Sequence, residues 1–187
     1  MSVLSSPLGA RQAIVGANGL ALRDLSLQQR SGVRGAGASA YLVQQSYPVP
    51  NAPNQLEPTG NGSWVMSLSH REFWMLQPDQ EAVASAMQGE ALAAEVWPLY
   101  CQHSHAWLQL AGERRAEVMA TLCGVDLSEA AFPEGNVVQT QVARVTSIIA
   151  HHAEGQAGVF SLFVDQSLAV YLWEALEDAI TGFDCST

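Results

Sequence analysis

The hydrophobic pattern between Leu108 and Thr140 predicts a strand, a helix and a second strand in close succession. Leu108 and Leu110 flank the polar Gln109, which is typical of the end of a half-buried strand. Apolar residues then recur at three- and four-residue spacing and so share one side of a helix: Ala116, Met119, Ala120 and Cys123. Gly124 follows, and we expect it to end this helix in a left-handed conformation. A turn at residues 131–135 leads into a Thr/Val-rich strand from Asn136 to Ile149.

The first part of the chain repeats this order of elements. Leu20 and Leu22 predict a strand, Val33 ends a second one, and a short helical face follows, made of Ala38, Tyr41 and Leu42. Residues 46–62 are rich in Pro and Gly and are predicted to form a long loop. Two further strands are expected at Ser63–Leu68 and Glu72–Leu76.

Each half is predicted to close with a helix. Pro78-Asp79 is expected to begin the first, whose apolar face is Ala82, Val83, Ala86 and Met87. In the second half, strands are expected at Leu99–Gln109 and Val159–Val164. Asp165 or Ser167 caps the last helix, and Gly182 ends it. Its buried stripe is Leu168, Leu172, Ala175, Leu176, Ala179 and Ile180.

An offset of 77 residues aligns the two halves. It superposes Val33 on Leu110 and Leu42 on Met119, together with further pairs: Leu22 with Leu99, Gly35 with Gly112, and Val65 with Val142. We therefore predict an α+β fold of two pseudo-equivalent β-β-α-β-β-(β)-α halves, about 19–95 and 96–187, with a mostly antiparallel sheet. Residues 1–18 are expected to form an arm that docks through Leu4, Leu8, Ile14 and Val15.

The charge balance limits the kind of partner. The net charge of −10 argues against nucleic acid or an anionic membrane as a partner. Only 14% of the residues are charged, against about 25% in an average domain. Either Gln and Ser coat a monomer, or partner subunits cover part of the surface. The 5 Trp residues favour the second alternative, because Trp is enriched in interface cores.

The cysteines and the N-terminus indicate a cytoplasmic protein. The 3 Cys are odd in number and widely spaced, which fits a reducing compartment. Neither a secretory signal nor an apolar run of the roughly 18–20 residues that a membrane helix needs is present.

Alternating residues Cys101, His103 and His105 are a candidate metal site. On a strand they would face the same side, and His151-His152 could add a fourth ligand. The alternative is an exposed strand face with Cys101 turned inward. We favour this alternative, since the spacing is not specific for zinc.

Other polar groups allow weaker interpretations. Cys123 could be a thiol nucleophile, but a core position at a helix C-terminus disfavours a thiolate. Asp24 with Ser26 could bind a ligand or form a local turn, and we favour the turn. Arg114-Arg115, with Glu113 and Glu117, is expected to form a solvated helix face. The glycines Gly32, Gly35 and Gly37 match a phosphate-binding loop poorly.

Aromatic residues suggest a contact surface. Phe73 and Trp74 are neighbours on one predicted strand and therefore face opposite sides. One side can be core, and the other needs cover. Trp64 belongs to the same aromatic group, and we expect one of these faces, together with Trp173, to contact a larger partner subunit.

The ordered set of motifs resembles a known family. Asp24-Leu25-Ser26, followed by Val33 and Gly35, is similar to a motif of the glycine-cleavage T-protein and its folate-binding relatives. The second half resembles the gamma subunit of heterotetrameric sarcosine oxidase, through Ser104-His105, Leu110-Ala111-Gly112, Cys123-Gly124-Val125-Asp126-Leu127, Phe132-Pro133-Glu134-Gly135, Thr140, Ser167 and Tyr171-Leu172-Trp173. Pro50, Asn54, Trp64-Val65 and Phe73-Trp74-Met75-Leu76 also suit it.

The resemblance implies a duplicated T-protein-like fold and a place in a complex with alpha, beta and delta subunits. Such a complex oxidises sarcosine to glycine, passes the one-carbon unit to tetrahydrofolate and forms hydrogen peroxide. Its FAD, FMN and NAD are implied to lie on other chains, so no catalytic, cofactor-binding or metal-binding residue is expected on this one.

The chain also departs from the T-protein pattern. It lacks an Asp-Asp pair for methylene transfer, and it contains no Lys at all. A structural, non-catalytic subunit is therefore our first expectation. A free-standing folate-binding one-carbon protein of the T-protein type is the alternative, and a metal-binding module is the third.

Overall fold

The computed structural model of the chain describes residues 4–16, 19–60, 62–81 and 91–184. The chain divides into two compact units. The first comprises Met1–Ser5 and Leu27–Ser104, and the second comprises Ser6–Ser26 and His105–Thr187. The second unit is therefore discontinuous, since the main segment of the first is inserted into it between residues 26 and 105.

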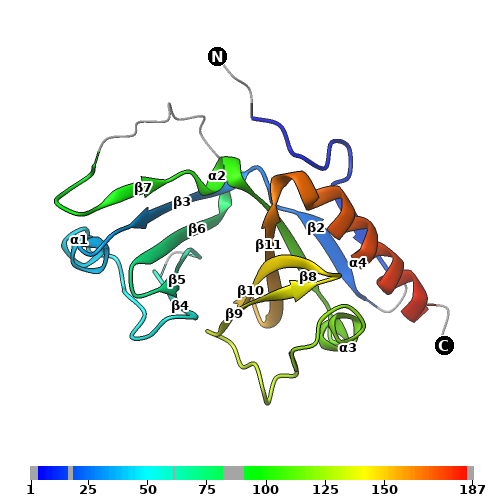
Figure 1. Cartoon of the computed structure of the whole chain (residues 1–187). Helices are drawn as coiled ribbons and strands as arrows, with labels where there is room; N and C mark the ends of the chain where they lie inside the picture. The colour runs from blue at the N-terminus through cyan, green and yellow to red at the C-terminus, as the bar shows by residue number, and fades with distance from the viewer. Residues whose placement is uncertain (1–3, 17–18, 61, 82–90, 185–187) are drawn as a thin grey trace. The chain divides into compact units, whose positions relative to one another are not determined.

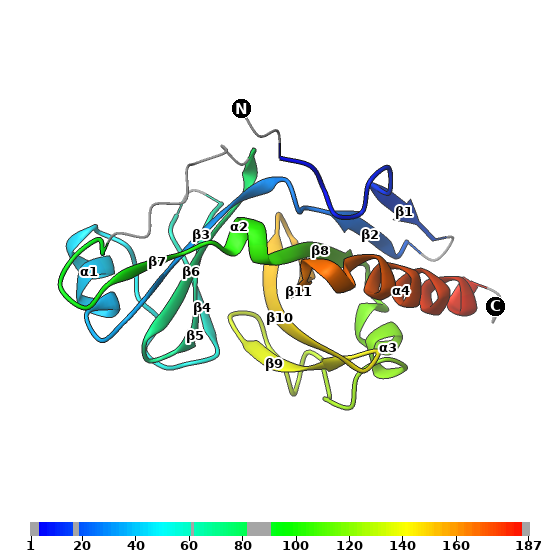
Figure 2. The same ribbon diagram turned by 45° about the horizontal axis from the view of Figure 1, so that its top comes forward.

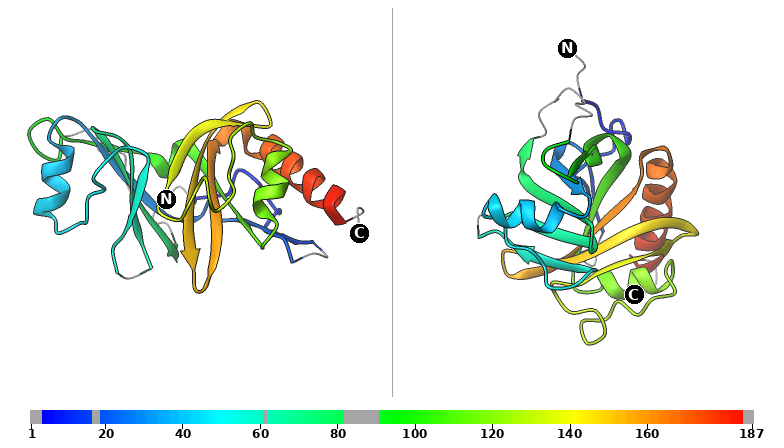
Figure 3. Two further views of the ribbon diagram at one scale, coloured as in Figure 1. Left: turned by 90° about the horizontal axis from the view of Figure 1, so that it is seen from below. Right: turned by 60° about the vertical axis from the view of Figure 1, so that its left-hand side comes forward.

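The first unit is an antiparallel sheet with one helix packed against it (Figure 1). Its strands, in the order β4-β5-β6-β3-β7, are β3 (Gln28–Arg34), β4 (Gln55–Pro58), β5 (Trp64–Ser69), β6 (Glu72–Glu81) and β7 (Trp97–Leu99). Helix α1 (Ala38–Gln44) lies beside this sheet (Figure 3), and a helical turn, α2 (Cys101–Ser104), ends the unit. Leu42 of α1 packs on Val33, Val65 and Phe73 of the strands, which explains the short helical face in the sequence.

The second unit is a six-stranded antiparallel sheet, with the strand order β1-β2-β8-β11-β10-β9 (Figure 2). The strands are β1 (Ala13–Val15), β2 (Ala21–Asp24), β8 (His105–Ala111), β9 (Val137–Val142), β10 (Val145–Glu154) and β11 (Ala157–Asp165). Helix α3 (Arg115–Ala120) follows β8. The 3₁₀ turn η1 (Gln166–Leu168) leads into the long helix α4 (Ala169–Asp184).

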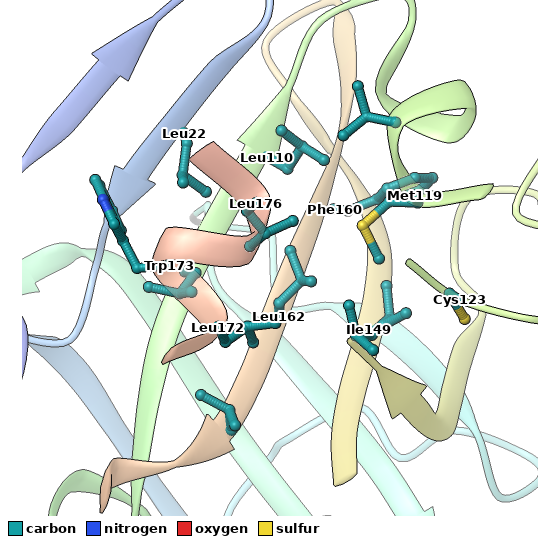
Figure 4. Close-up of a cluster of buried hydrophobic side chains, with 14 of the residues drawn as sticks. Leu22, Leu110, Met119, Cys123, Ile149, Phe160, Leu162, Leu172, Trp173 and Leu176 are labelled. Carbon is teal, nitrogen blue, oxygen red and sulfur yellow. The ribbon is translucent and has the colours of Figure 1, made fainter. Parts of the chain in front are cut away.

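Helix α4 buries its apolar side against the sheet of the second unit (Figure 4). Leu172, Trp173 and Leu176 are at most 1% exposed and pack on Leu22 and Leu110 of the neighbouring strands β2 and β8. Asp165 caps the preceding turn, because its carboxylate accepts the backbone N–H of Ser167 at 2.9 Å, which confirms the predicted cap. Of the predicted stripe, Leu172, Leu176 and Ile180 are fully buried, whereas Leu168 is exposed.

The two sheets share one order of elements. The first sheet has the strand order β7-β3-β6-β5-β4, and the second sheet, without its edge strand β1, has the order β2-β8-β11-β10-β9. Position by position these strands correspond, and α1 follows β3 as α3 follows β8. Gly35 and Gly112, which the 77-residue offset superposes, both follow the corresponding strand and both have positive φ, at 140° and 116°. A mixed α+β fold with antiparallel sheets is confirmed, and a duplication of the halves stays a prediction.

The compact units differ in their bounds from the expected halves. Strand β2 belongs by sequence to residues 19–95 but pairs with β8, where Leu22 lies opposite Leu110. Strand β7 belongs to 96–187 but pairs with β3, where Leu99 lies opposite Gly32. Hydrophobic periodicity predicts strands but not which strands pair, so the sequence did not predict that β2 and β7 exchange sheets.

The N-terminal arm is partly a strand of the second sheet. Residues 13–15 form β1 and pair with β2, and Leu8 is only 1% exposed in the core of that unit. Val15, which we expected to dock, is 76% exposed.

Helix ends were the least accurate predictions. Pro78 and Asp79 lie in β6 rather than at a helix start, because β6 continues its pairing with β3 as far as Glu81. The residues 82, 83, 86 and 87 predicted for that helix lie outside the described part of the chain. Helix α3 ends at Ala120, so Gly124 neither ends it nor has positive φ. Gly182 lies within α4.

Three loop and strand predictions also need correction. Residues 46–62 contain the short strand β4. The expected strand Leu99–Gln109 is divided into the end of β7, the turn α2 and most of β8. The expected strand Asn136–Ile149 is the hairpin β9–β10, whose turn residues Ala143 and Arg144 have positive φ, the backbone conformation that tight hairpins need.

A glycine pair tests the packing of the first unit. A Cβ on Gly35 would lie 1.8 Å from the Glu95 carbonyl oxygen, and its φ of 140° disfavours side chains, whereas a Cβ on Gly124 meets nothing within 4 Å. We expect Gly35→Ala to cost at least about 2 kcal/mol of unfolding free energy. The matched control Gly124→Ala should be neutral or slightly stabilising. Urea unfolding measures both, and equal midpoints would contradict this packing.

Candidate functional site

The candidate metal ligands do not share a strand face. Cys101 and His103 lie in α2, because the N–H groups of His103 and Ser104 both donate to the Tyr100 carbonyl, whereas His105 begins β8. Cys101 is buried and His103 is exposed. Among the described residues, no group of three or more His, Cys, Asp or Glu side chains could hold a metal ion. The prediction of a strand at these three residues is therefore wrong, whereas Cys101 is turned inward, as the favoured alternative expected.

The described cysteines are poor nucleophiles in this environment. Burial raises the pKa of the Cys101 thiol to about 12, although the nearby Arg30 lowers it somewhat. Cys123 is 8% exposed and forms an isolated bridge with Val142, beyond the end of α3 rather than within the helix. Its sulfur accepts the backbone N–H of Val125 at 3.5 Å.

Asp24 and Ser26 form a local turn, as favoured from the sequence. One carboxylate oxygen of Asp24 accepts the backbone N–H of Ser26 at 2.8 Å, and the other accepts the hydroxyl of Ser6. The Ser26 hydroxyl accepts the backbone N–H of Trp107 at 3.1 Å, and the N–H of Leu25 donates to the Trp107 carbonyl at 2.8 Å. This turn therefore fixes the end of β2 to β8.

The glycines near α1 allow close packing rather than phosphate binding. A Cβ on Gly32 would lie 2.7 Å from the Cys101 sulfur, and one on Gly37 would lie 2.7 Å from the Ala94 carbonyl. The hairpin that precedes β7 therefore approaches the start of α1 closely.

The two neighbouring arginines of the second unit have different environments. Arg114 is partly exposed, pairs with Glu117 at 2.9 Å and lies 4.9 Å from the ring centre of Phe183. Arg115 is only 5% exposed. Its guanidinium donates to the Gly112 carbonyl and to Glu129, and lies 5.1 Å from the ring centre of Phe160.

Arg115 forms a buried cluster with His151. The Nδ1–H of His151 donates to the Phe132 carbonyl at 2.7 Å, since a carbonyl only accepts. Its Nε2 therefore accepts from Arg115 Nη2 at 3.0 Å, and the imidazole is neutral. The rings of Phe132 and Phe160 enclose it, one stacked and one edge-on. The cluster fixes the Phe-Pro turn to β10. Sequence reasoning treated these residues as a surface face and a possible fourth ligand, because their contacts are non-local.

A second buried cluster links His152, Ser161 and Trp107. The Ser161 hydroxyl accepts the indole N–H of Trp107 at 2.8 Å and lies 2.8 Å from Nε2 of His152. Because Nδ1 of His152 faces the Ala153 carbonyl, its Nε2 is the acceptor for the Ser161 hydroxyl. A serine hydrogen-bonded to a histidine is the beginning of a nucleophile–base pair. Both residues are at most 3% exposed, however, so this pair has the burial of a structural hydrogen bond.

The aromatic residues expected at a partner contact are mostly buried. Phe73 and Trp74 are each 3% exposed, and Trp173 is 1% exposed. These three side chains cannot present a face to another chain, so that prediction is wrong. The large apolar side chains that are exposed lie elsewhere, and include Val43, Leu92, Trp97 and Tyr171.

The described helices are all too short or too polar to span a bilayer.

Comparisons with known proteins support the fold. No family model matches the chain, and no curated protein matches it in sequence. The structure is similar to a chain of the heterotetrameric sarcosine oxidase from Corynebacterium sp. U-96 in complex with pyrrole 2-carboxylate, with a TM-score of 0.76 and 20% identity, over 93% of this chain and 90% of that one. It is also similar to the glycine cleavage system aminomethyltransferase T from Bartonella henselae, with a TM-score of 0.51 and 18% identity, over 83% of this chain and 44% of that one.

These two likenesses confirm, at the level of fold, the relation that the sequence motifs suggested. At 20% and 18% identity they establish a shared architecture and leave activity open. The chain spans less than half of the aminomethyltransferase but nearly all of the sarcosine oxidase chain that it matches.

The buried arginine should dominate the stability of the second unit. Replacing Arg115 by Ala leaves the Nε2 of His151 without a donor and removes the cation above Phe160, so we expect a loss of about 2–4 kcal/mol. Arg114→Ala is the matched control, since it also removes an ion pair and a cation above a ring, that of Phe183, but at partly exposed positions, so its loss should be smaller. Thermal and urea unfolding of both variants measure the difference. Equal losses would show that the cluster contributes nothing.

His152 should make stability depend on pH. Burial lowers its pKa from 6.5 to about 4, so between these values the unfolded chain binds a proton that the folded chain does not. The contribution is fully present above pH 6.5 and is lost as the pH falls towards 4, by up to about 3 kcal/mol. Urea unfolding at several pH values should give a shallower dependence for His152→Gln than for the wild type. The same slope in both proteins would rule this out.

Proposed function

We propose that this chain is a non-catalytic gamma subunit of a cytoplasmic, heterotetrameric sarcosine-oxidase-type complex. The single observation that carries the proposal is the likeness in fold to a chain of such an oxidase over 93% of this protein and 90% of that chain. Coverage of both chains in nearly equal shares means that the match is to a subunit of about the same length. It is not a match to one domain of a much larger subunit.

In this proposal the chemistry belongs to other subunits. The complex would demethylate sarcosine to glycine, transfer the one-carbon unit to tetrahydrofolate and form hydrogen peroxide. FAD, FMN, NAD and tetrahydrofolate would be bound by the alpha, beta and delta partners.

The state of the reactive side chains supports a structural role. Cys101 is buried with a pKa near 12, and the Ser161–His152 pair is buried with the His pKa near 4. Arg115 and His151 are engaged with each other and with a backbone carbonyl. These groups hold strands and turns in place, a role that needs no access to a substrate.

Exposed apolar residues of the first unit provide a contact surface for a partner. Trp97, on the edge strand β7, is 49% exposed, and the nearby Leu92 is 47% exposed. The N–H of Leu92 donates to the Val96 carbonyl, which places both residues on one hairpin. Pro98 lies between Trp97 and Leu99 and lacks an N–H, so a partner strand is a poor fit to this edge, whereas side-chain packing on Trp97 is favourable.

The test is co-expression with the alpha, beta and delta subunits of the same organism. We expect the chain to co-purify with a flavin-containing complex and to show no sarcosine turnover by itself. A chain that stays separate, or that oxidises a methylated amine alone, would contradict the assignment.

Within that experiment, Trp97→Ala should weaken association at least 10-fold, since exposed Trp residues are typical interface hot spots. Val15→Ala is the matched control, because Val15 is an exposed apolar residue of the other unit. Unfolding curves should show that both variants are fully folded at the temperature of the association assay, because half of the Trp97 side chain is buried and its loss lowers the midpoint. Unchanged assembly in Trp97→Ala would place the interface elsewhere.

The alternative is a free-standing folate-binding protein of the T-protein type, which the fold likeness to the aminomethyltransferase favours. The missing Asp-Asp pair and the absence of Lys count against it. Isothermal titration of the isolated chain with tetrahydrofolate distinguishes the two, since only the alternative requires binding.

A further inference from the structure

The segment of residues 128–135, which carries the Phe-Pro turn between α3 and β9, is attached to the sheet of the second unit through His151. Phe132 is the buried residue of this segment, and its neighbours are exposed or half-buried. The Nδ1–H of His151 donates to the Phe132 carbonyl at 2.7 Å. The backbone N–H of Gly135 donates to the His151 carbonyl at 2.9 Å. Both of these hydrogen bonds from the segment to β10 therefore involve one histidine.

The imidazole of His151 has one position at which it can take up a further proton. Its Nδ1 already carries the hydrogen that the Phe132 carbonyl accepts. The remaining lone pair, on Nε2, accepts from Nη2 of Arg115 at 3.0 Å, and a guanidinium only donates. A protonated His151 would point a second N–H at the Arg115 N–H, and two cations would then be in contact. Uptake of a proton and the contact with Arg115 exclude each other.

The packing around His151 leaves little space for the ring to turn away from Arg115. A Cβ on Gly158 would lie 2.8 Å from Nε2 of His151 and 2.6 Å from Nη2 of Arg115, so the backbone of β11 closes over their contact. The Phe132 ring stacks on the imidazole, with centroids 5.9 Å apart, and the Phe160 ring meets it edge-on at 5.0 Å. Relief of the repulsion therefore requires the segment to move.

The ionisable neighbours of His151 come from three elements. Arg115 lies on α3 and also donates to Glu129 of the segment at 3.0 Å. The Glu129 side chain is 80% exposed, so water and salt screen its charge. His152 is next along β10, and its side chain bonds to Ser161 on the opposite side of the sheet. Arg115 is thus the charge that a protonated His151 would meet directly.

We propose that the Arg115–His151 contact is a proton-sensitive latch, which opens on acidification and releases residues 128–135 together with the Phe132 side chain. In the released form the imidazole is in water, where a histidine takes up a proton near pH 6.5. The released form binds a proton that the closed form does not, so its population rises as the pH falls through this value. The proposal is independent of the assembly role above, because the latch lies within one unit of the isolated chain.

Hydrogen exchange of the full chain, read by mass spectrometry at pH 7.5 and pH 5.5, tests the latch. After correction for the intrinsic pH dependence of exchange, the amides of residues 128–135 should exchange about 10-fold faster at pH 5.5 in the wild type. The relevant donors are the backbone N–H groups of Phe132 and Gly135, which bond to the carbonyls of Ser128 and His151.

Two variants separate His151 from other causes. In His151→Gln the amide nitrogen donates to the Phe132 carbonyl and the amide oxygen accepts from Arg115, but the side chain does not titrate, so exchange should be the same at both pH values. His152→Gln is the matched control, since it removes the neighbouring buried histidine, and its segment should respond to pH as the wild type does.

Four results would overturn the proposal. They are equal exchange of the segment at both pH values in the wild type, the same 10-fold response in His151→Gln, and a parallel increase at Leu108 and Leu110 of β8, which would indicate global unfolding. The fourth is loss of the response in Glu129→Gln, which would make the carboxylate the titrating group. If His151→Gln does not fold, 15N NMR of histidine-labelled wild type decides, because the latch requires Nε2 of His151 to gain its proton over the pH range in which the segment opens.

Discussion

The pairing of β2 with β8 is the interaction on which this architecture depends. Leu22 lies opposite Leu110, and both are completely buried under α4. Beyond the ladder, Leu25, Ser26 and Trp107 exchange hydrogen bonds at the point where the chain leaves for the first unit. Without this pairing the second sheet would lose β1 and β2, and the apolar side of α4 would lose part of its cover. The same contact brings together the two ends of the 78-residue segment between residues 26 and 105.

The buried histidines of the second unit hold parts of this architecture together. His151 holds a turn through Arg115, and His152 holds Ser161 and Trp107 across neighbouring strands. In a low-dielectric interior such hydrogen bonds stabilise a unique packing. The same burial keeps the histidine nitrogens out of contact with any substrate. The large apolar side chains that are exposed in the described part of the chain include Trp97 and Leu92, whereas Phe73, Trp74 and Trp173 are buried.

Several site predictions failed for one shared reason. Cys101, His103 and His105 alternate in sequence, but the backbone turns at Tyr100 and separates them. Phe73 and Trp74 face opposite sides of their strand as expected, yet both sides are covered. Spacing reports which residues share a face only while one element continues. It carries no information on what packs against that face.

The amino-acid sequence by itself determined most of the strands, the Asp24–Ser26 turn, the cap at Asp165 and the apolar side of α4, because each depends on neighbours within a few residues. The order of these elements along the chain indicated the α+β class. Tertiary structure decided the rest. The exchange of β2 and β7 between sheets, the burial of Arg115 beside partly exposed Arg114 and the neutral state of His151 all depend on residues far apart in the chain. Their energies arise from contacts between elements, and local periodicity does not encode which elements meet.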